Sequence, residues 1–340
     1  MQIHYHTDQL PVFRRAVITI GTFDGVHTGH ASILRQLRQE AARIDGETVI
    51  ITFFPHPRKI VKGGSEDLRL INTLEEKIAL LAWQRIDHLV IVPFTEAFSQ
   101  MTAEEYIEDF LIARFHPHTV IIGYDHRFGK GRQGDYHLLE RFSGPQHFRL
   151  EEIPVHLLDQ VSVSSTRIRE AILRADIDTA NQLLGYPFFF SGTVVKGNQL
   201  GRTLGFPTAN LRLDNGEKLL PGDGIYAVEA ILLPEEETGS AAPGTRQTAA
   251  AGTRDSLFNA PRLKGMMSIG LRPTDDGMDR TIEVNLFDFG QEIYGRELRV
   301  FVVRYLRPEL KFSGLDQLKT AIAKDKVDAL AALEQAIRLT

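Results

Sequence analysis

The feature that most constrains the fold is a glycine-punctuated segment that joins a short apolar run to an amphipathic helix near the N-terminus. The β-branched run 17–20 is typical of a strand that is buried on both faces. Gly21, Gly25 and Gly29 follow it and let the backbone turn tightly and approach a ligand closely. The segment 21–30 therefore predicts a turn into a helix N-terminus, where free N–H groups and the helix dipole favour a phosphate.

Strand-like and helix-like segments alternate through the first half of the chain. Further apolar runs lie at 49–53, 89–92, 120–122 and 148–153. Amphipathic segments separate them, and threonines with a glutamate three residues later predict capping boxes at 73–76 and 102–105. The alternation predicts an α/β domain with a doubly wound parallel sheet, in which ligands bind beyond the carboxyl ends of the strands.

Polar residues gather where three of these strands end. His27 and His30 follow the first strand, His56 the second, and Asp125 and Arg127 the fourth. Each alone would be interpreted as a solvated loop residue, but together they are expected to meet at one sheet edge. Two imidazoles beside a phosphate-ready turn could neutralise charge on a phosphoryl group, which favours nucleotide chemistry. A metal site is the less favoured alternative, because no cysteine and no third histidine lies nearby at ligand spacing.

Hydroxyls and arginines open the next predicted helix at 164–169. Ser164 could cap this helix, and Arg167 and Arg169 would place guanidinium groups in its first turn. Cations there oppose the helix dipole, so a purely structural role is disfavoured. Arginine held for a triphosphate or pyrophosphate explains the placement better.

The pattern changes after residue 185, where Gly-Tyr-Pro ends a short helix. Strand-like runs without intervening helices follow at 188–195, 225–232, 263–269, 281–287 and 298–305. They predict an antiparallel barrel or sandwich, and helical periodicity returns at 315–339. We therefore expect two domains, 1–185 and 186–340. The segment 235–260 has few apolar side chains and is expected to be a mobile insertion; a lid function is the less favoured alternative.

A second glycine-containing segment carries chemistry in this half. Gly201 and Gly205 flank Arg202 and allow close backbone approach to a phosphate, although the spacing matches neither a Walker P-loop nor a dinucleotide fingerprint. Thr208 and Asn210 are alternate residues of an extended segment, so both point to one side. They offer two hard oxygens suited to Mg²⁺.

Glu283 lies on the strand-like run 281–287, on the face opposite to its apolar neighbours. From the spacing alone, an outward strand residue is the favoured interpretation. On the inner face of a barrel, the same carboxylate would be a positioned general base for a hydroxyl.

These motifs resemble those of the prokaryotic bifunctional riboflavin kinase/FMN adenylyltransferases, also called FAD synthetases. The matching motifs lie in family order at 21–30, 52–57, 123–129, 164–169, 201–210, 221–227, 269–274 and 305–309. The resemblance implies a nucleotidyltransferase domain of the HxGH superfamily, followed by a six-stranded antiparallel barrel with a C-terminal helix. It also implies the function: riboflavin is phosphorylated to FMN by ATP in the C-terminal domain, and FMN is adenylylated to FAD in the N-terminal domain, releasing pyrophosphate.

In the N-terminal domain, the resemblance implies that His27 and His30 contact ATP phosphates and stabilise the α-phosphoryl transition state. The nucleotide- or phosphate-binding residues that it implies there are Gly21, Phe23, Asp24, Gly25, Gly29, Ser164 and Arg167. The flavin-binding residues that it implies are His56, Asp125, Arg127 and Phe128. His126 stands where the family usually has Phe.

In the C-terminal domain, the resemblance implies that Thr208 and Asn210 bind the Mg²⁺–nucleotide and that Glu283 activates the ribityl 5′-hydroxyl of riboflavin. The phosphate-binding residues there would be Gly201, Arg202 and Gly205. Ser268 and Asn285 stand where Asn and His are often found, and the insertion at 235–260 is longer than usual.

The composition agrees with an enzyme that acts on small molecules. A net charge of -5 gives no global attraction to nucleic acid or anionic lipid. The absence of cysteine suits a reducing cytoplasm, the first residues lack the pattern of a signal peptide, and no apolar run approaches the ~18 residues of a membrane helix. We therefore expect a cytoplasmic protein that binds riboflavin, FMN, ATP and Mg²⁺, with at most weak self-association.

Two alternatives stay open at the level of the sequence. The barrel could be a flavin-binding or regulatory module without kinase activity, since Ser268 and Asn285 depart from the family pattern. The chain could also be a non-catalytic nucleotide-binding protein. The flavins formed from riboflavin and ATP would discriminate among the three hypotheses.

Overall fold

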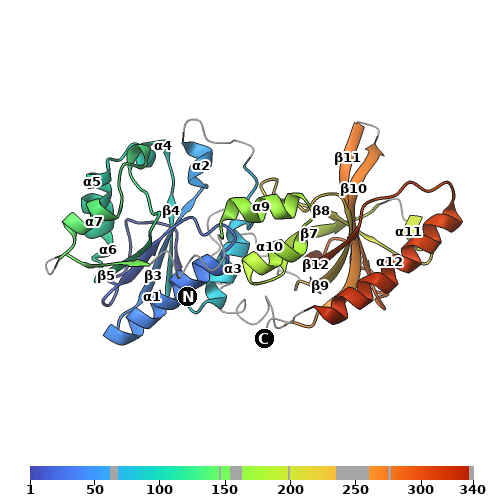
Figure 1. Ribbon diagram of the computed structural model, residues 1–340, viewed down its shortest axis with the longest axis horizontal. Helices are drawn as coiled ribbons and strands as arrows, with labels where there is room; N and C mark the ends of the chain where they lie inside the picture. The colour runs from blue at the N-terminus through green and yellow to red at the C-terminus, as the bar shows by residue number, and fades with distance from the viewer. Residues whose placement is uncertain are drawn as a thin grey trace. The chain divides into compact units, whose positions relative to one another are not determined.

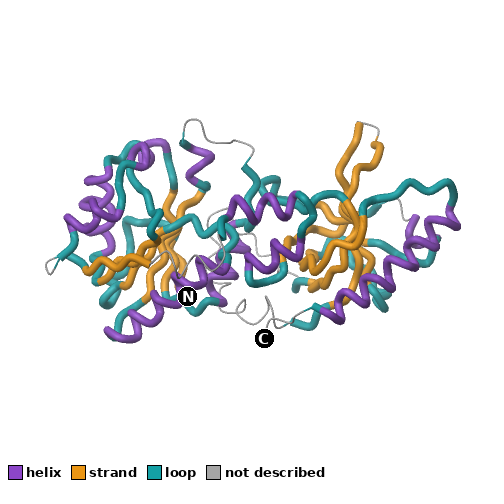
Figure 2. The backbone as a smooth tube through the Cα atoms, in the orientation of Figure 1, coloured by secondary structure: helices purple, strands orange, loops and turns teal. Residues whose placement is uncertain are grey.

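The computed structural model describes residues 1–61, 68–144, 147–153, 163–197, 200–234, 260–274 and 277–336 (Figure 1). The chain forms two compact units and passes from the first to the second between Ser164 and Ser165. Figure 2 shows strands and helices interleaved in the first unit and strands gathered together in the second. None of the described helices is long and apolar enough to cross a membrane.

A six-stranded parallel sheet forms the centre of the first unit. Its strands are β1 (Gln2–His4), β2 (Val17–Ile20), β3 (Thr48–Phe54), β4 (His88–Pro93), β5 (Thr119–Gly123) and β6 (Arg149–Ile153). Their order in the sheet is β1-β4-β3-β2-β5-β6, so β2 lies between β3 and β5. The chain builds outward from β2 to β3 and β4 and later returns to β5 on the other side, which makes the β2/β5 boundary the topological switch point.

Helical segments connect these strands, as the alternation predicts. They are α1 (Thr28–Ile44), α2 (Pro57–Ile60), α3 (Leu74–Trp83), α4 (Glu96–Ser99), α5 (Ala103–Glu105), the π-helix η1 (Tyr106–Ile112), α6 (Ala113–Phe115), the 3₁₀ turn η2 (Lys130–Arg132) and α7 (Tyr136–Phe142). Both predicted capping boxes are present, at Thr73–Glu76 and Thr102–Glu105. The sequence pattern missed β1, which has three residues and no extended apolar run.

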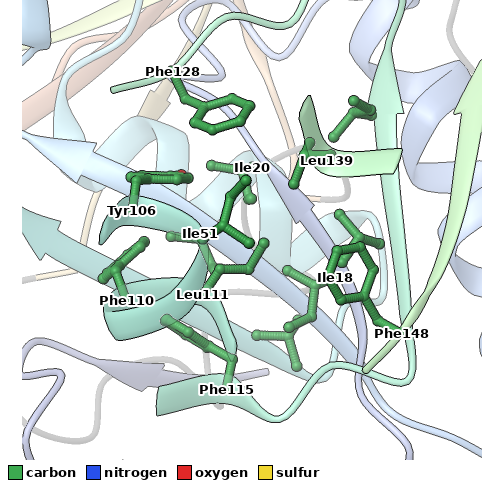
Figure 3. Close-up of a cluster of buried hydrophobic side chains, with 14 of the residues drawn as sticks. Ile18, Ile20, Ile51, Tyr106, Phe110, Leu111, Phe115, Phe128, Leu139 and Phe148 are labelled. Carbon is green, nitrogen blue, oxygen red and sulfur yellow. The ribbon is translucent and has the colours of Figure 1, made fainter. Parts of the chain in front are cut away.

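The sheet is covered on both faces, as its apolar strands require. On one face, Ile18 and Ile20 pack against aromatic residues of the segment 103–115 and against residues near β6, as Figure 3 shows. Because side chains alternate along a strand, the buried Val17 and Thr19 point to the other face, where α1 contacts the sheet. The two layers fix the β2–α1 turn between them.

The second unit is a closed six-stranded antiparallel barrel, which decides between the predicted barrel and sandwich. Its strands are β7 (Phe188–Val195), β8 (Ala209–Arg212), β9 (Gly224–Leu232), β10 (Leu263–Thr274), β11 (Gly277–Leu286) and β12 (Glu297–Arg307), in the order β10-β11-β8-β7-β12-β9. Its helices are α9 (Ser165–Leu173), α10 (Ile177–Leu184), α11 (Leu200–Thr203) and α12 (Leu315–Gln335). The expected mobile insertion lies outside the described residues, except for residue 260.

The helices α9 and α10 belong to the compact unit of the barrel. The side-chain amide of Asn181 donates to the carbonyl of Val302 over 3.0 Å and accepts from the backbone N–H of Phe188 over 2.7 Å. The boundary expected between residues 185 and 186 stays a prediction about the functional domains, whereas the compact units divide after Ser164.

The helix α12 covers the outer face of the barrel. Ala329, Ala332 and Leu333 pack against Ala227 of β9 and Met266 of β10. An ion pair ties the helix to β12: the guanidinium of Arg307 donates to both carboxylate oxygens of Asp325, over 2.7 and 2.6 Å. The side chain of Asp325 is 5% exposed, so this pair is largely shielded from water.

Replacing Arg307 with Met should lower the free energy of unfolding by about 3 kcal/mol, because Asp325 would stay buried without its cation. Lys324→Ala is the matched control, since Lys324 pairs with Asp328 at the surface of the same helix and its loss should cost less than about 1 kcal/mol. Urea denaturation followed by circular dichroism measures both values. Equal effects would show that the Arg307 pair does not hold α12.

Candidate active sites

The turn between β2 and α1 has an unusual backbone. Phe23, Gly25 and Val26 have φ angles of 48°, 92° and 37°, and a β-branched residue such as Val rarely adopts a positive φ. The backbone N–H of Gly21 donates to the carbonyl of Ile51 on the neighbouring β3 over 3.0 Å. Strained backbone of this kind clusters at binding and active sites.

The two histidines of the turn lie face to face. The ring centroids of His27 and His30 are 3.7 Å apart with an interplanar angle of 16°, and the ring of Phe23 lies 4.9 Å from that of His30. Nδ1 of His27 caps α1 by accepting the backbone N–H of His30 over 3.4 Å, so the neutral ring carries its proton on Nε2. A Cβ at Gly29 would lie 3.2 Å from the His27 ring, so the glycine permits this close stacking.

Both imidazoles are held in the neutral form. Burial lowers the pKa of His27 to about 4. Burial also lowers the pKa of His30, and the nearby charges of His27 and Lys77 lower it further. Nδ1 of His30 is buried and makes no hydrogen bond within the described part of the chain. A buried polar atom of this kind is what a ligand would satisfy.

Two buried charged residues, Asp24 and Lys77, lie near the turn. Asp24 is 1% exposed, and one of its carboxylate oxygens accepts the backbone N–H groups of Ile71 and Asn72 over 3.0 and 3.3 Å. Lys77 of α3 is also buried; burial lowers its pKa to about 8, and the Asp24 carboxylate opposes that shift. The sequence analysis missed Lys77, although a signal existed. It lies three residues after Leu74 and four before Leu81, on the apolar face of the predicted helix.

The loop after β3 lies beside this turn. Because β3 pairs with β2, the two loops leave the sheet at neighbouring positions, and Thr52 Oγ1 of β3 donates to the carbonyl of Thr22 over 3.3 Å. His56 is 8% exposed and caps α2 by accepting the backbone N–H of Arg58 on its Nδ1 over 3.2 Å. The predicted convergence of His56 with the β2–α1 turn is therefore supported by the topology.

The loop after β5 flanks the turn on the other side, because β5 also pairs with β2. Asp125 and Arg127 are exposed, and Arg127 forms an ion pair with Asp135 over 3.0 Å. Phe128 is instead buried in the core, with its ring 4.9 Å from that of Tyr106. It can support a flavin site only from below.

His126, where the family usually has Phe, behaves like an apolar residue. Its ring stacks on Phe128 at 5.7 Å, and burial lowers its pKa to about 4. The imidazole therefore stays neutral at neutral pH and fills the place of an aromatic ring.

The remaining residues predicted for this site lie at the passage between the units. Ser164 ends the first unit, whereas Arg167 lies on α9 of the second. Their expected contact with bound nucleotide stays a prediction.

In the second unit, the predicted metal and base residues meet. Glu283 on β11 is the direct cross-strand partner of Asn210 on β8, and Thr208 Oγ1 donates to a carboxylate oxygen of Glu283 over 3.3 Å. A Cβ at Gly197 would lie 2.2 Å from the amide nitrogen of Asn210, so only glycine leaves room for this side chain. The side chains of Thr208, Asn210 and Glu283 therefore lie close together, and the absence of a side chain at Gly197 leaves room for Asn210.

The segment before β8 folds into a compact turn. Gly201 and Arg202 lie on α11, Arg202 is exposed, and Gly205 has a φ of 85°. The backbone N–H of Phe206 donates to the carbonyl of Gly201 over 2.8 Å, which closes the turn towards Thr208.

Glu283 lies on the outer face of the barrel, as the spacing alone favoured, and not on the inner face that the general-base interpretation assumed. Its cross-strand partner on β10 is Ser268. Ser268 lies on the same face of β10 as Met266, and Met266 packs against α12. Ile282 and Val284, with 3% and 0% exposure, point into the barrel instead. The carboxylate is half-buried nonetheless, because Thr208 and the segment before it lie against that outer face.

The two departures from the family pattern fill structural positions around this site. The side-chain amide of Asn285 donates to the carbonyl of Pro207 over 2.6 Å and so holds the segment that carries Thr208. Ser268 Oγ donates to Glu309 over 3.4 Å. The sequence analysis assigned no role to Glu309, although the 305–309 motif contains it. A Cβ at Gly270 would lie 2.0 Å from its carboxylate, so the motif glycine at 270 makes room for this second acid.

The oxygen donors suit a magnesium–nucleotide complex better than a protein-only metal centre. Among the described residues, no group of three or more His, Cys, Asp or Glu side chains could hold a metal ion. Mg²⁺ typically takes few protein ligands and completes its shell with water and substrate phosphates. The hydroxyl of Thr208 and the amide oxygen of Asn210 beside Glu283 fit that donor set.

Comparison with known proteins identifies the family of the chain. A family model described as FAD synthetase matches residues 10–167, and one described as riboflavin kinase matches residues 184–333. A bifunctional riboflavin kinase/FMN adenylyltransferase of Haemophilus influenzae is 36% identical over 320 residues, which cover 94% of this chain and 95% of the relative. Proteins of the same name from Escherichia coli K12 and Bacillus subtilis 168 are 34% and 32% identical, and each alignment covers more than nine tenths of both chains.

A solved structure also matches along the whole chain. A crystal structure described as a macrolide-efflux protein from Streptococcus pneumoniae has a TM-score of 0.79 and 27% identity, and the match covers 96% of this chain and 97% of that one. The order of the two family models agrees with the order of the two folds, the parallel sheet first and the barrel second. The chain therefore belongs to the bifunctional riboflavin kinase/FMN adenylyltransferase family and has both activities.

Proposed function

We propose that each activity has its own site, one in each compact unit. The proposal rests on the different side chains that the two units bring together. Glu283 accepts a hydrogen bond from Thr208 and faces Asn210 in the barrel, whereas the neutral His27 and His30 stack at a helix N-terminus in the other unit.

In the barrel, Glu283 is proposed to accept the proton of the ribityl 5′-hydroxyl of riboflavin as the oxygen attacks the γ-phosphorus of ATP, giving FMN and ADP. Its carboxylate already accepts the hydroxyl of Thr208, which supports its use as a hydrogen-bond acceptor for a second hydroxyl. Thr208 and Asn210 would hold Mg²⁺, which when bound neutralises charge on the phosphates. Gly201, Arg202 and Gly205 would lie along the phosphates.

In the first unit, a phosphate oxygen of FMN is proposed to attack the α-phosphorus of ATP, so that pyrophosphate leaves and FAD forms. The N–H groups of His27 and His30 donate to phosphoryl oxygens as negative charge builds there. Gly21, Phe23, Gly25 and Gly29 shape the turn around the phosphates. Positioning and charge stabilisation carry such transfers, so the mechanism needs no covalent enzyme intermediate.

The other predicted site residues are proposed to complete the adenylyltransferase site. His56, Asp125 and Arg127 would line the flavin or its phosphate, because the loops that carry them flank the β2–α1 turn. Ser164, the last residue of the first unit before α9, would hold ATP phosphates, and the phosphate-binding role that the resemblance implies for Arg167 stays a prediction. We also propose that the chain works in the cytoplasm with weak self-association at most.

Glu283→Gln should lower the rate of FMN formation from riboflavin by at least about 100-fold, because the amide cannot take the proton. Added FMN should still be converted to FAD at the wild-type rate. Chromatography of the flavins measures both steps, and the exposed Glu292→Gln is the matched control. Wild-type FMN formation by the Glu283 variant would remove the general base from the mechanism.

His30→Ala should lower FAD formation by about 100-fold or more while FMN accumulates, because the transition state loses one hydrogen-bond donor. The exposed His137→Ala should leave both products unchanged. Loss of both activities in folded His30→Ala protein would contradict the assignment of two separate sites.

Lys77 should give the adenylyltransferase a pH dependence that the kinase lacks. With a pKa of about 8, the ammonium is charged below pH 8 and neutral above it, so FAD formation from FMN should fall as the pH rises from 7 to 9. Lys77→Met should lower the rate at pH 7 about tenfold and flatten this part of the profile. Lys77→Arg keeps the charge at pH 9 and should retain its rate there. An unchanged profile in Lys77→Met would assign the pH dependence to another group.

A further inference from the structure

A basic groove lies at the edge of the parallel sheet opposite to the adenylyltransferase site. It has a volume of about 650 Å³, and it opens where β5 and β6 begin, at the amino ends of the strands. The β2–α1 turn lies beyond the carboxyl ends of the same sheet, so the groove belongs to a different surface of the first unit. Nothing in the proposed reaction uses it.

The groove is lined by cationic and titratable side chains over an apolar floor. Phe148 and Pro117 are buried beneath it. The charged and imidazole side chains along its wall are Arg15, His116, His118, His147 and Arg149. None of the described residues that line the groove is acidic. An apolar floor with a few convergent polar groups is the usual composition of a small-molecule site, and its volume is within the common range.

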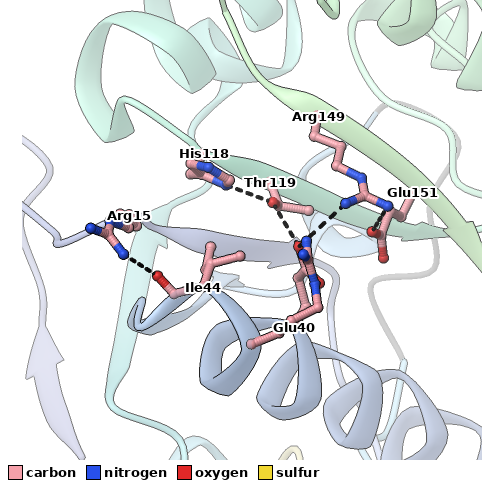
Figure 4. Close-up of polar contacts among 8 residues, drawn as sticks. Arg15, Glu40, Ile44, His118, Thr119, Arg149 and Glu151 are labelled. Carbon is pink, nitrogen blue, oxygen red and sulfur yellow. Dashed lines mark hydrogen bonds and ion pairs between the residues drawn. The ribbon is translucent and has the colours of Figure 1, made fainter. Parts of the chain in front are cut away.

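The contacts around the groove leave positive charge on its wall (Figure 4). The guanidinium of Arg15 donates to the carbonyl of Ile44, which carries no net charge and uses one of the five guanidinium donors. Arg149 forms an ion pair with Glu151 over 3.0 Å and lies 3.9 Å from Glu40. The Glu40 carboxylate in turn accepts two hydrogen bonds from Arg43, over 2.6 and 2.7 Å. The guanidinium groups of Arg43 and Arg149 thus share the carboxylates of Glu40 and Glu151, while Arg15 contacts a neutral carbonyl.

Hydrogen-bond donors other than the arginines also reach this groove. Nδ1 of His118 lies 2.9 Å from Thr119 Oγ1, and the hydroxyl of Thr119 donates towards Glu40 over 3.5 Å. When Thr119 donates to Glu40, its oxygen can accept from Nδ1–H of His118, so this contact fixes the orientation of the imidazole at the groove.

A metal ion does not explain the three histidines. Within the described part of the chain, no cluster of three or more His, Asp or Glu side chains is close enough to hold one. Guanidinium groups also repel a cation, whereas they match phosphate oxygens in geometry and charge.

We propose that this groove binds an anionic small molecule through a phosphate or polyphosphate group. Arg15 and Arg149 contact the anion, and Phe148 and Pro117 form the floor on which the rest of the ligand lies. Inorganic phosphates and nucleotides share the anionic group and differ in whether they use that floor.

The direct test locates an anion in crystals of the full-length chain. Crystals soaked in sodium tungstate, a heavy analogue of phosphate, should show anomalous density within hydrogen-bond distance of Arg15 and Arg149. The density should disappear in Arg15→Gln/Arg149→Gln and persist in Arg114→Gln, which removes an exposed arginine that pairs with Asp8 elsewhere in the same unit. Density at the β2–α1 turn or in the barrel without density in the groove would overturn the proposal.

A solution measurement keeps the test independent of crystal conditions. Isothermal titration calorimetry with inorganic phosphate should show, besides any binding at the two active sites that these substitutions leave unchanged, a binding event at least tenfold weaker in Arg15→Gln/Arg149→Gln than in the wild type and in Arg114→Gln. Arg149→Lys, which keeps the charge, should bind with intermediate affinity. Tighter binding of AMP than of phosphate to the same event would identify a nucleotide, and equal binding would identify a bare phosphate. Identical isotherms for the wild type and the double variant would refute the site.

Discussion

The stacked pair of His27 and His30 depends on one constraint, the burial of both rings at the N-terminus of α1. The helix begins at Thr28, where Nδ1 of His27 caps it, and the capping bond orients one ring while Phe23 lies against the other. Asp24 ties the same turn to residues 71 and 72, and the two covered faces of the sheet leave the turn no room to relax. The local chain geometry, the neutral state of the imidazoles and their readiness for phosphate thus share one cause.

Much of the fold follows from patterns that a sequence displays directly. Period-2 and period-3.6 apolar spacing predicted the parallel sheet, the barrel and the capped helices, because burial dictates both periods. Apolar spacing alone left the choice between barrel and sandwich open, which only the family resemblance decided, and the docking of α9 and α10 on the barrel was not predicted. The closure of the barrel and this docking depend on contacts between distant residues, such as the bonds of Asn181 to β7 and β12, which leave no local signal. The short β1 forms only because β4 offers it a paired edge.

The site residues show the same contrast: their types follow from local motifs, whereas their burial depends on contacts between distant parts of the chain. Motif residues such as His27, Thr208 and Glu283 could be proposed from the sequence because chemistry restricts the residue types that can serve in such sites. The face of the barrel on which a side chain lies, and how deeply that side chain is buried, were harder to predict. The alternation around Glu283 gave its side of the strand, but only α12 and the segment before β8 show that this side is the outer one and that it is covered. The burial of Phe128 and Lys77 was not predicted for the same reason, since burial is a property of the whole fold.

The chemistry of the two substrates explains why the two sites differ so much. Riboflavin presents a hydroxyl, which attacks phosphorus well only if a base takes its proton, and a half-buried carboxylate such as Glu283 meets that need. FMN presents a phosphate whose second ionisation lies at about pH 6, as for other phosphate monoesters, so at neutral pH it is already an anion. A base in the adenylyltransferase site would have no proton to remove. What that transfer needs is donors that carry no negative charge, and the lowered pKa values of His27 and His30 keep both rings as neutral donors at that place.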